Sequence, residues 1–280
     1  HPLNTSTIKK EYRSSKIFEN TEKTKQIIQN LKSVSTSPKE FFYKGGSITA
    51  KKELKRFLET KAKNYTANKN NPSLDVVSNM SPYLHFGQIS PLEIALEVLN
   101  QEIPQDSKDS YLEELIIRRE LSFNFVFYNA SYDNFDCLPK WCKDTLINHK
   151  KDKRDYTYSL EELELAKTHD PYWNAAQKEM VIKGKMHGYM RMYWGKKIIE
   201  WTKNPETAFS NALYLNNKYQ LDGRDPNSYT GVAWCFGKHD RPWKERNIFG
   251  KIRYMNENGL RRKFDIEAYV NKIKILSSNL

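Results

Sequence analysis

Residues 178–201, KEMVIKGKMHGYMRMYWGKKIIEW, decide the fold class of this 280-residue chain. Large apolar side chains recur there with the spacing of one helix face, at Met186, Met190, Tyr193, Trp194, Ile198 and Trp201. This stripe predicts one long helix that packs against other elements. Signals for strands are nearly absent elsewhere. The sequence therefore predicts an all-α fold, an irregular domain of many helices.

Further helices are indicated by their start signals. Ser-x-x-Glu capping boxes, in which Ser and Glu side chains satisfy free backbone N–H groups, occur three times. They are Ser90 with Glu93, Ser110 with Glu113 and Ser159 with Glu162, and they predict helices over 91–102, 111–128 and 160–167. An apolar period over 49–65 predicts another helix.

The domain organisation follows from a change in composition. Residues 1–45 are rich in Ser, Thr and Lys and have little apolar periodicity, which is typical of a connector or arm. We expect the folded part to start near Gly45 and Gly46 and to occupy residues 46–275 as one domain.

Charge indicates the class of partner. Lys and Arg number 46 against 34 Asp and Glu, which gives a net charge of +12. Such a balance favours polyanions such as DNA, RNA or acidic lipid, although a basic surface that serves only solubility fits it too.

Cysteine usage and hydropathy indicate the compartment. Cys137, Cys142 and Cys235 lack the spacing of metal ligands and are odd in number, so neither a zinc site nor a disulfide framework is expected. No apolar run is long enough to cross a bilayer, and the polar first residues do not resemble a signal peptide. We expect an intracellular protein with no metal and no membrane association.

A polar run, NNKYQLDGRDPNSYTGVAW over 216–234, is the best candidate for a functional site. It fits neither helical nor strand periodicity, and clusters of this kind usually lie on loops held by a rigid scaffold. Its polar members are Asn216, Asp222, Arg224, Asp225 and Asn227. Trp234 ends the run and basic residues follow in GKHDRPW, so an aromatic platform beside positive charge suggests nucleic acid.

A second candidate site lies in VSNMSPYLHFGQISP, residues 77–91. Its two Ser-Pro steps favour two helix N-termini in quick succession, and such ends bind anions. Ser78, Asn79 and Ser81 would add donors for a phosphate or pyrophosphate. Most Ser-Pro steps, however, only start helices.

A charged pair and an aromatic pair at helical spacing each allow two interpretations, a structural role or part of a functional site. Glu114 and Arg118 are i, i+4 neighbours, and a surface ion pair explains them as well as a site does. Trp194 and Trp201 are two helical turns apart, about 10 Å in rise, with Trp173 in the preceding segment. Spacing alone makes these tryptophans core residues.

Taken together, five ordered motifs resemble the catalytic domain of the class II cyclobutane pyrimidine dimer DNA photolyases, a branch of the photolyase and cryptochrome family. The motifs are SNMSPYLHFGQISP, EELIIRREL, GYMRMYWGKKIIEW, LNNKYQLDGRDPNSYTGVAW and FGKIRYM. The resemblance covers about residues 46–275. It implies a helical FAD-binding catalytic domain without the N-terminal Rossmann-like antenna domain, and hence without an antenna chromophore.

The resemblance also implies how a non-covalent FAD would be held. Residues assigned to its pyrophosphate and ribose are Tyr65, Ser78, Asn79, Met80 and Ser81. Arg191 and Asp222 resemble the ion pair beside the isoalloxazine, and Asp225 belongs to the same acidic loop. Asn216 resembles the asparagine that faces flavin N5, with Asn227 as the alternative. Trp194, Trp173 and Trp201 match the chain that carries electrons from the surface to oxidised flavin.

The implied reaction is the light-driven splitting of pyrimidine dimers in DNA by an electron from excited FADH⁻. Glu114, protonated in an apolar pocket, would bind a pyrimidine carbonyl of the flipped-out dimer. Trp234 and Met192 would line the lesion pocket, and Arg241 and Arg253 would fill the space that the lesion vacates. The protein is expected to act as a monomer.

Two departures from the motif pattern concern the DNA side. Ile117 and Arg118 stand where related photolyases often place an aromatic residue that packs against the lesion, so half of that aromatic clamp is expected to be missing or supplied by another residue. Arg118 is counted among the expected DNA-binding residues. The segment CFGK after Trp234 is one residue shorter than usual, which affects the position of Arg241.

Two other classes of protein remain open. A cryptochrome-like light sensor or partner-binding module would keep FAD and the tryptophans without repairing DNA. A flavin-free basic DNA-binding module would keep only the charge, and would leave Arg191, Asp222 and Asn216 without a reason to occur together.

Overall fold

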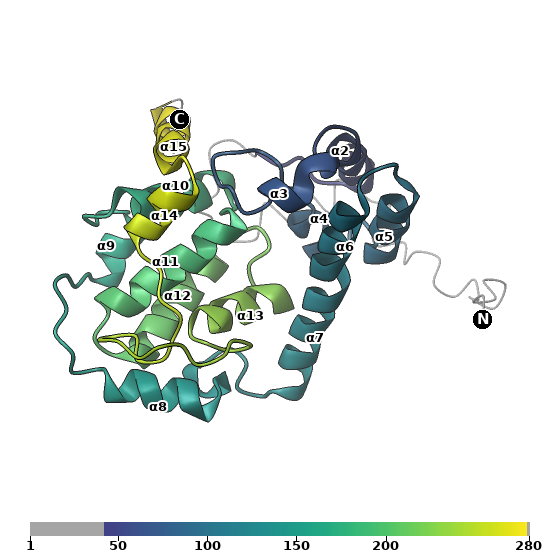
Figure 1. The fold of residues 1–280 in the computed structure, drawn as a ribbon. Helices are drawn as coiled ribbons and strands as arrows, with labels where there is room; N and C mark the ends of the chain where they lie inside the picture. The colour runs from purple at the N-terminus through teal and green to yellow at the C-terminus, as the bar shows by residue number, and fades with distance from the viewer. Residues whose placement is uncertain (1–41, 279–280) are drawn as a thin grey trace, which may run out of the picture. The chain divides into compact units, whose positions relative to one another are not determined.

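The computed structural model describes residues 42–278, in which helices are joined by loops and turns (Figure 1). The connector predicted for residues 1–45 lies outside this range except for residues 42–45. No strand occurs within 42–278, where the backbone forms only an isolated bridge between Arg246 and Gly250. The all-α prediction is confirmed. The α-helices are α2 (Ser47–Thr60), α3 (Tyr65–Asn68), α4 (Ser81–His85), α5 (Pro91–Asn100), α6 (Gln105–Leu112), α7 (Arg119–Tyr128), α8 (Lys140–Asn148), α9 (Leu160–Glu164), α10 (Pro171–Lys183), α11 (Gly188–Trp201), α12 (Pro205–Tyr219), α13 (Pro226–Cys235), α14 (Glu257–Lys263) and α15 (Ile266–Ser278).

Two hydrophobic clusters organise these helices. The smaller is formed by α2 to α6 together with the 3-10 turn η4 (Ala62–Asn64) and the π-helical turn η5 (Glu113–Arg118). The larger extends from α7 to α15 and includes the 3-10 turn η6 (Phe135–Cys137). Helix α7 continues from η5 and runs beside α13, while α15 packs on α10 (Figure 1). The chain therefore links the two clusters through η5 and α7, and side chains of α4 add bonds from Ser81 to Lys185 and from His85 to Asp225.

The apolar stripe over 178–201 is divided between two helices, so the prediction of one long helix is wrong. Helix α10 ends at Lys183 because Gly184 adopts the left-handed conformation with φ 69°, and its N–H donates to the carbonyl of Met180. Helix α11 then starts at Gly188 behind the cap His187. The break allows α10 and α11 to fold onto each other and bury both apolar faces.

Other helix starts were predicted with mixed success. The capping box of Ser159 and Glu162 is confirmed, with Ser159 Oγ accepting from the Glu162 N–H and the Glu162 carboxylate accepting in return. Ser90 caps α5 as expected. The box at Ser110 is wrong, because the helix begins five residues earlier, at Gln105. The helix predicted over 49–65 ends at Thr60, followed by η4 and α3.

The polar run over 216–234 is mostly helical, which contradicts the prediction of a loop. Asn216 lies in the last turns of α12, and Asn227 and Trp234 lie in α13. Only the segment 220–225 connects the two helices. The polar side chains of 216–234 are bonded within the run, as between Asn216 and Ser228, or to other segments, as between Asp222 and Arg191.

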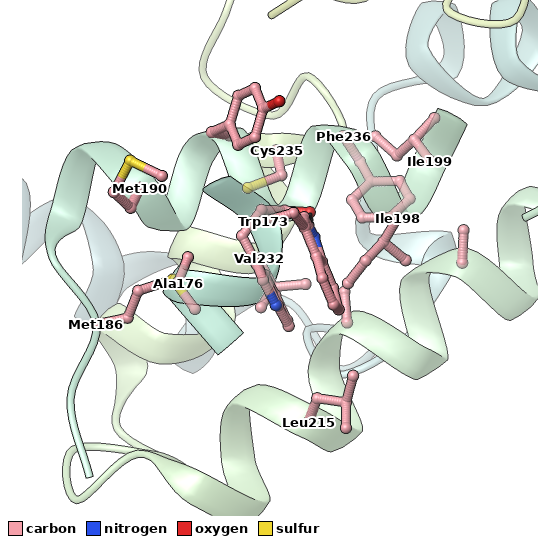
Figure 2. Packing of buried hydrophobic residues seen from close by; sticks show 14 of the residues in the cluster. Trp173, Ala176, Met186, Met190, Ile198, Ile199, Leu215, Val232, Cys235 and Phe236 are labelled. Carbon is pink, nitrogen blue, oxygen red and sulfur yellow. Dashed lines mark hydrogen bonds between the residues drawn. The ribbon is translucent and has the colours of Figure 1, made fainter. Parts of the chain in front are cut away.

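The centre of the larger cluster is aromatic. Trp173 of α10 is fully buried among side chains of α11, α12 and α13, including Ile198, Leu215 and Val232 (Figure 2). Gly195 allows α13 to approach α11, because a Cβ at this position would lie 2.5 Å from Cys235 Sγ. Helix α11 thus packs against α10, α12 and α13.

The break after α10 gives the first prediction. A Cβ on Gly184 would lie 2.8 Å from Leu221 Cγ and would occupy a left-handed backbone position. We expect Gly184→Ala to lower the free energy of unfolding by about 1–3 kcal/mol. Gly188→Ala is the control, because its Cβ meets nothing within 4 Å, and it should stay within about 0.5 kcal/mol of wild type. Urea denaturation of both variants measures this; equal stabilities would refute the role of Gly184.

Candidate functional site

A cluster of charged side chains lies where α4 meets the segments before α11 and after α12. Lys185 Nζ donates to Ser81 Oγ at 2.6 Å, and Arg191 Nη2 lies 3.9 Å from Asp222 Oδ1. The predicted ion pair of Arg191 and Asp222 is therefore present as a long contact. Ser81, from the predicted anion site, faces the same cluster through Lys185, which the sequence analysis missed.

The charges of this cluster are mutually dependent. Burial acts to raise the pKa of Asp222, but Arg191 and Lys185 outweigh it and the pKa is lowered. Burial lowers the pKa of Lys185 to about 8, against the opposing influence of Asp222. The Asp222 carboxylate thus stays charged at neutral pH. The pKa of the Lys185 amine, by contrast, lies close to neutral pH.

A chain of buried amides continues from Arg191. Its Nη2 donates to Gln220 Oε1, and Gln220 Nε2 donates to Asn216 Oδ1 at 2.7 Å. Asn216 Nδ2 in turn donates to Ser228 Oγ. Asn216 is fully buried, whereas its alternative Asn227 is exposed at the start of α13. The structure therefore places Asn216, and not Asn227, in the network of Arg191.

Two of the other predicted anion-binding residues, Ser78 and Tyr65, contact Tyr111, a residue that sequence reasoning missed. Tyr111 donates to Ser78 Oγ at 3.1 Å, and its ring lies 5.3 Å from that of Tyr65. Burial raises the pKa of Tyr65 far above its ordinary value, so the phenol stays protonated as a donor. Asn79 has φ 59°, a left-handed conformation that asparagine tolerates. Met80 is buried beneath them.

Asp225 connects the N-terminus of α13 to α4. One of its carboxylate oxygens accepts from the Asn227 N–H at 2.9 Å, and the other lies 3.2 Å from His85 Nδ1. The residue therefore acts as a helix cap and as a bridge between the two clusters.

These residues fit an anionic dinucleotide cofactor. The buried Nε of Arg191 has no hydrogen-bond partner within the described residues, so it offers a donor to an acceptor outside the protein. Lys185, Ser81 and Ser78 add donors suited to phosphate oxygens. By contrast, residues 42–278 bring together no three His, Cys, Asp or Glu side chains that would hold a metal ion.

Three tryptophans form a continuous buried series, with Trp173 between the other two. Its ring is stacked on Trp194 at 6.3 Å with planes 7° apart, and it meets Trp201 edge-on at 5.5 Å. Trp201 is itself only 2% exposed. The series continues to the surface through Tyr158. The ring centre of Tyr158 lies 5.2 Å from that of Trp201, and the Tyr158 hydroxyl lies 2.6 Å from Nδ1 of the exposed His169.

Glu114 and Arg118, for which the sequence left an ion pair open, do not pair with each other, because these residues lie in the π-helical turn. In a π-helix residues five apart lie above one another, and Arg118 Nε accordingly pairs with Glu113 Oε1 at 3.1 Å. Glu114 pairs with Lys69 Nζ at 3.1 Å, and its side chain is 50% exposed. The expectation that Glu114 lies in an apolar pocket is therefore wrong for this structure.

Arg118 reaches the residue expected to bind the lesion. Its guanidinium carbon lies 4.8 Å from the ring centre of Trp234, a half-buried residue near the end of α13. His239 borders the same indole at 5.6 Å. Met192 lies close by, with its sulfur 3.8 Å from Cys235 Sγ.

The two predicted arginines of the basic segment meet on an aromatic residue that sequence reasoning missed. Arg241 and Arg253 lie 5.7 Å and 5.2 Å from the ring of Trp243, which is 42% exposed. The shortened segment before Arg241 does not prevent this meeting. The only sequence signal for Trp243 was its place beside arginine in GKHDRPW.

Within the described range, no helix combines the length and the apolar character needed to cross a membrane.

Comparison with known proteins gives close relatives. No protein-family model matches the chain. The chain is 59% identical over 233 residues to a deoxyribodipyrimidine photo-lyase of Methanothermobacter thermautotrophicus. The aligned region covers 83% of this chain and 51% of that protein. A deoxyribodipyrimidine photo-lyase of Arabidopsis thaliana is 53% identical over 226 residues, covering 79% and 45%. The chain spans about half the length of the curated relatives it matches.

A solved structure supports the fold. A bacterial class III photolyase from Agrobacterium tumefaciens superimposes with a TM-score of 0.65 at 18% identity, over 83% of this chain and 45% of that one. At this identity the likeness concerns the fold alone. The chain is therefore a homologue of deoxyribodipyrimidine photo-lyases over about half of their length, with the all-α catalytic-domain fold of photolyases and cryptochromes.

Proposed function

We propose that this chain is the FAD-binding catalytic half of a class II photolyase, which repairs cyclobutane pyrimidine dimers in DNA under light. One observation carries the proposal. Helix α11 directs Arg191 toward Asp222 and, one turn later, places Trp194 against Trp173. A charged site for an anionic cofactor and an aromatic series thus share one rigid helix.

In this proposal the charged cluster holds FAD. Lys185, Ser81 and Ser78 bind the pyrophosphate, with Tyr65 beside them as a buried donor. Arg191 and Asp222 bind the polar edge of the flavin, and Asn216 is fixed by Gln220 so that its amide keeps one orientation. When bound as FADH⁻ and excited by light, the flavin supplies an electron that opens the cyclobutane ring and is then recovered.

The DNA side of the proposal uses the half-buried Trp234 as a stacking surface and Met192 as its apolar neighbour. A dimer is poorly stacked and paired in the duplex, so flipping it out costs less than flipping an ordinary base. Arg241, Trp243 and Arg253 lie on an exposed segment suited to the phosphate backbone and to the gap in the duplex. Glu114 must leave Lys69 to contact the lesion.

Repair is tested directly with an oligonucleotide that contains one thymine dimer. We expect the FAD-loaded, reduced protein to restore intact thymines under near-UV or blue light and to do nothing in the dark, as measured by chromatography of the products. A protein that binds and photoreduces FAD but repairs no dimer would instead be a light sensor. A protein that never binds FAD would be a flavin-free DNA-binding module.

The tryptophan series gives a separate prediction. Trp173→Phe interrupts the contacts to both Trp194 and Trp201, so light-driven reduction of oxidised FAD should slow by about tenfold or more, equivalent to about 1.4 kcal/mol in activation free energy. Absorbance at the flavin bands during illumination measures this rate.

Trp141→Phe is the matched control, because this half-buried residue of α8 contacts none of the three tryptophans by ring stacking within the described chain. It should photoreduce like wild type. If the two variants behave alike, the series is only part of the core.

A further inference from the structure

The guanidinium of Arg118 is held in one place by two contacts of different kinds. It lies 4.8 Å from the ring centre of Trp234, within range of a cation–π interaction. Behind it, Nε donates to Glu113 Oε1 at 3.1 Å. An ordinary surface ion pair explains the second contact but not the first.

This placement depends on the π-helical turn. The turn brings Glu113 and Arg118 together at a separation of five residues, and α7 then continues along α13. Arg118 thereby lies against Trp234 near the end of α13. Because Nε is occupied by Glu113, the two terminal nitrogens remain as donors, and within residues 42–278 they form no hydrogen bond.

The surroundings of Trp234 are nitrogen-rich. His239 lies on another side of the indole at 5.6 Å, and Lys238 lies 4.4 Å from the ring of Phe125, which packs edge-on against His239. A pyrimidine pair that approaches this indole therefore brings its own phosphate toward the Arg118 guanidinium.

We propose that Arg118 is a substrate-binding residue that sets selectivity for damage, with its two terminal nitrogens donating to the phosphate that links the two pyrimidines of a flipped dimer. This inference rests on the proposed function. The planar fork of a guanidinium matches two phosphate oxygens, and the Glu113 contact orients it beforehand. Where an aromatic side chain would only stack, Arg118 recognises the lesion by charge and hydrogen bonding.

The test compares binding of single-stranded oligonucleotides with and without one thymine dimer to the FAD-loaded full chain in the dark. Arg118→Ala should weaken binding of the dimer oligonucleotide by about tenfold and should weaken the undamaged one much less. The slope of log affinity against log salt for the dimer should become shallower by about 0.7. Arg118→Lys should recover only part of the loss, because a lysine lacks the planar fork.

Arg119→Ala is the matched control. Arg119 follows directly in the chain and also lies over an aromatic ring, Phe123 at 4.2 Å, but it has no contact with Trp234. Its removal should affect both oligonucleotides equally. Far-UV circular dichroism and flavin content verify that each variant is folded.

The outcomes separate the inference from the proposed function. If wild type does not prefer the dimer, the proposed function fails. If wild type prefers the dimer and Arg118→Ala keeps that preference, only the inference fails. Tighter binding by Arg118→Ala would also overturn it, because Arg118 would then block the indole instead of binding substrate.

Discussion

The contact between Lys185 and Ser81, together with the ion pair of Arg191 and Asp222, is the interaction on which the rest of the site depends. Ser81 begins α4, a helix of the smaller hydrophobic cluster. Lys185 precedes α11, Arg191 lies in α11 and Asp222 follows α12, all in the part of the chain that forms the larger cluster. Removing one partner of a buried ion pair costs about 3–5 kcal/mol, because the other charge is left uncompensated. The Lys185 contact therefore joins the two clusters, and Lys185 and Arg191 present donors to an anionic ligand.

The cofactor side and the DNA side share two helices. Helix α11 carries Arg191 and the two outer tryptophans, Trp194 and Trp201. Helix α13 carries Ser228 of the buried amide chain and, near its other end, Trp234. Since α7 runs along α13, the π-helical turn before α7 can place Arg118 against Trp234. A rigid pair of helices thus fixes the distance between the two sides.

Sequence reasoning succeeded where local chemistry decides the structure. The Ser159 capping box and the lack of strands within residues 42–278 were predicted in this way. The meeting of Arg191 with Asp222 was instead implied by the family resemblance. It failed where a backbone choice redirects side chains. Gly184 in a left-handed conformation divides the stripe over 178–201, and a π-helical turn replaces the expected contact of Arg118. Lys185 and Gln220 were missed because only tertiary packing brings them to Ser81 and Arg191.

The central claim is that the cluster around Lys185 binds FAD, and a titration of FAD into wild type, Lys185→Arg and Lys185→Met tests it most directly. Wild type and Lys185→Arg should saturate at one FAD per chain, as measured by quenching of flavin fluorescence. Lys185→Met should bind about tenfold more weakly, because a charge-assisted hydrogen bond is lost. Equal affinity of Lys185→Met, or no binding by wild type, would contradict the account.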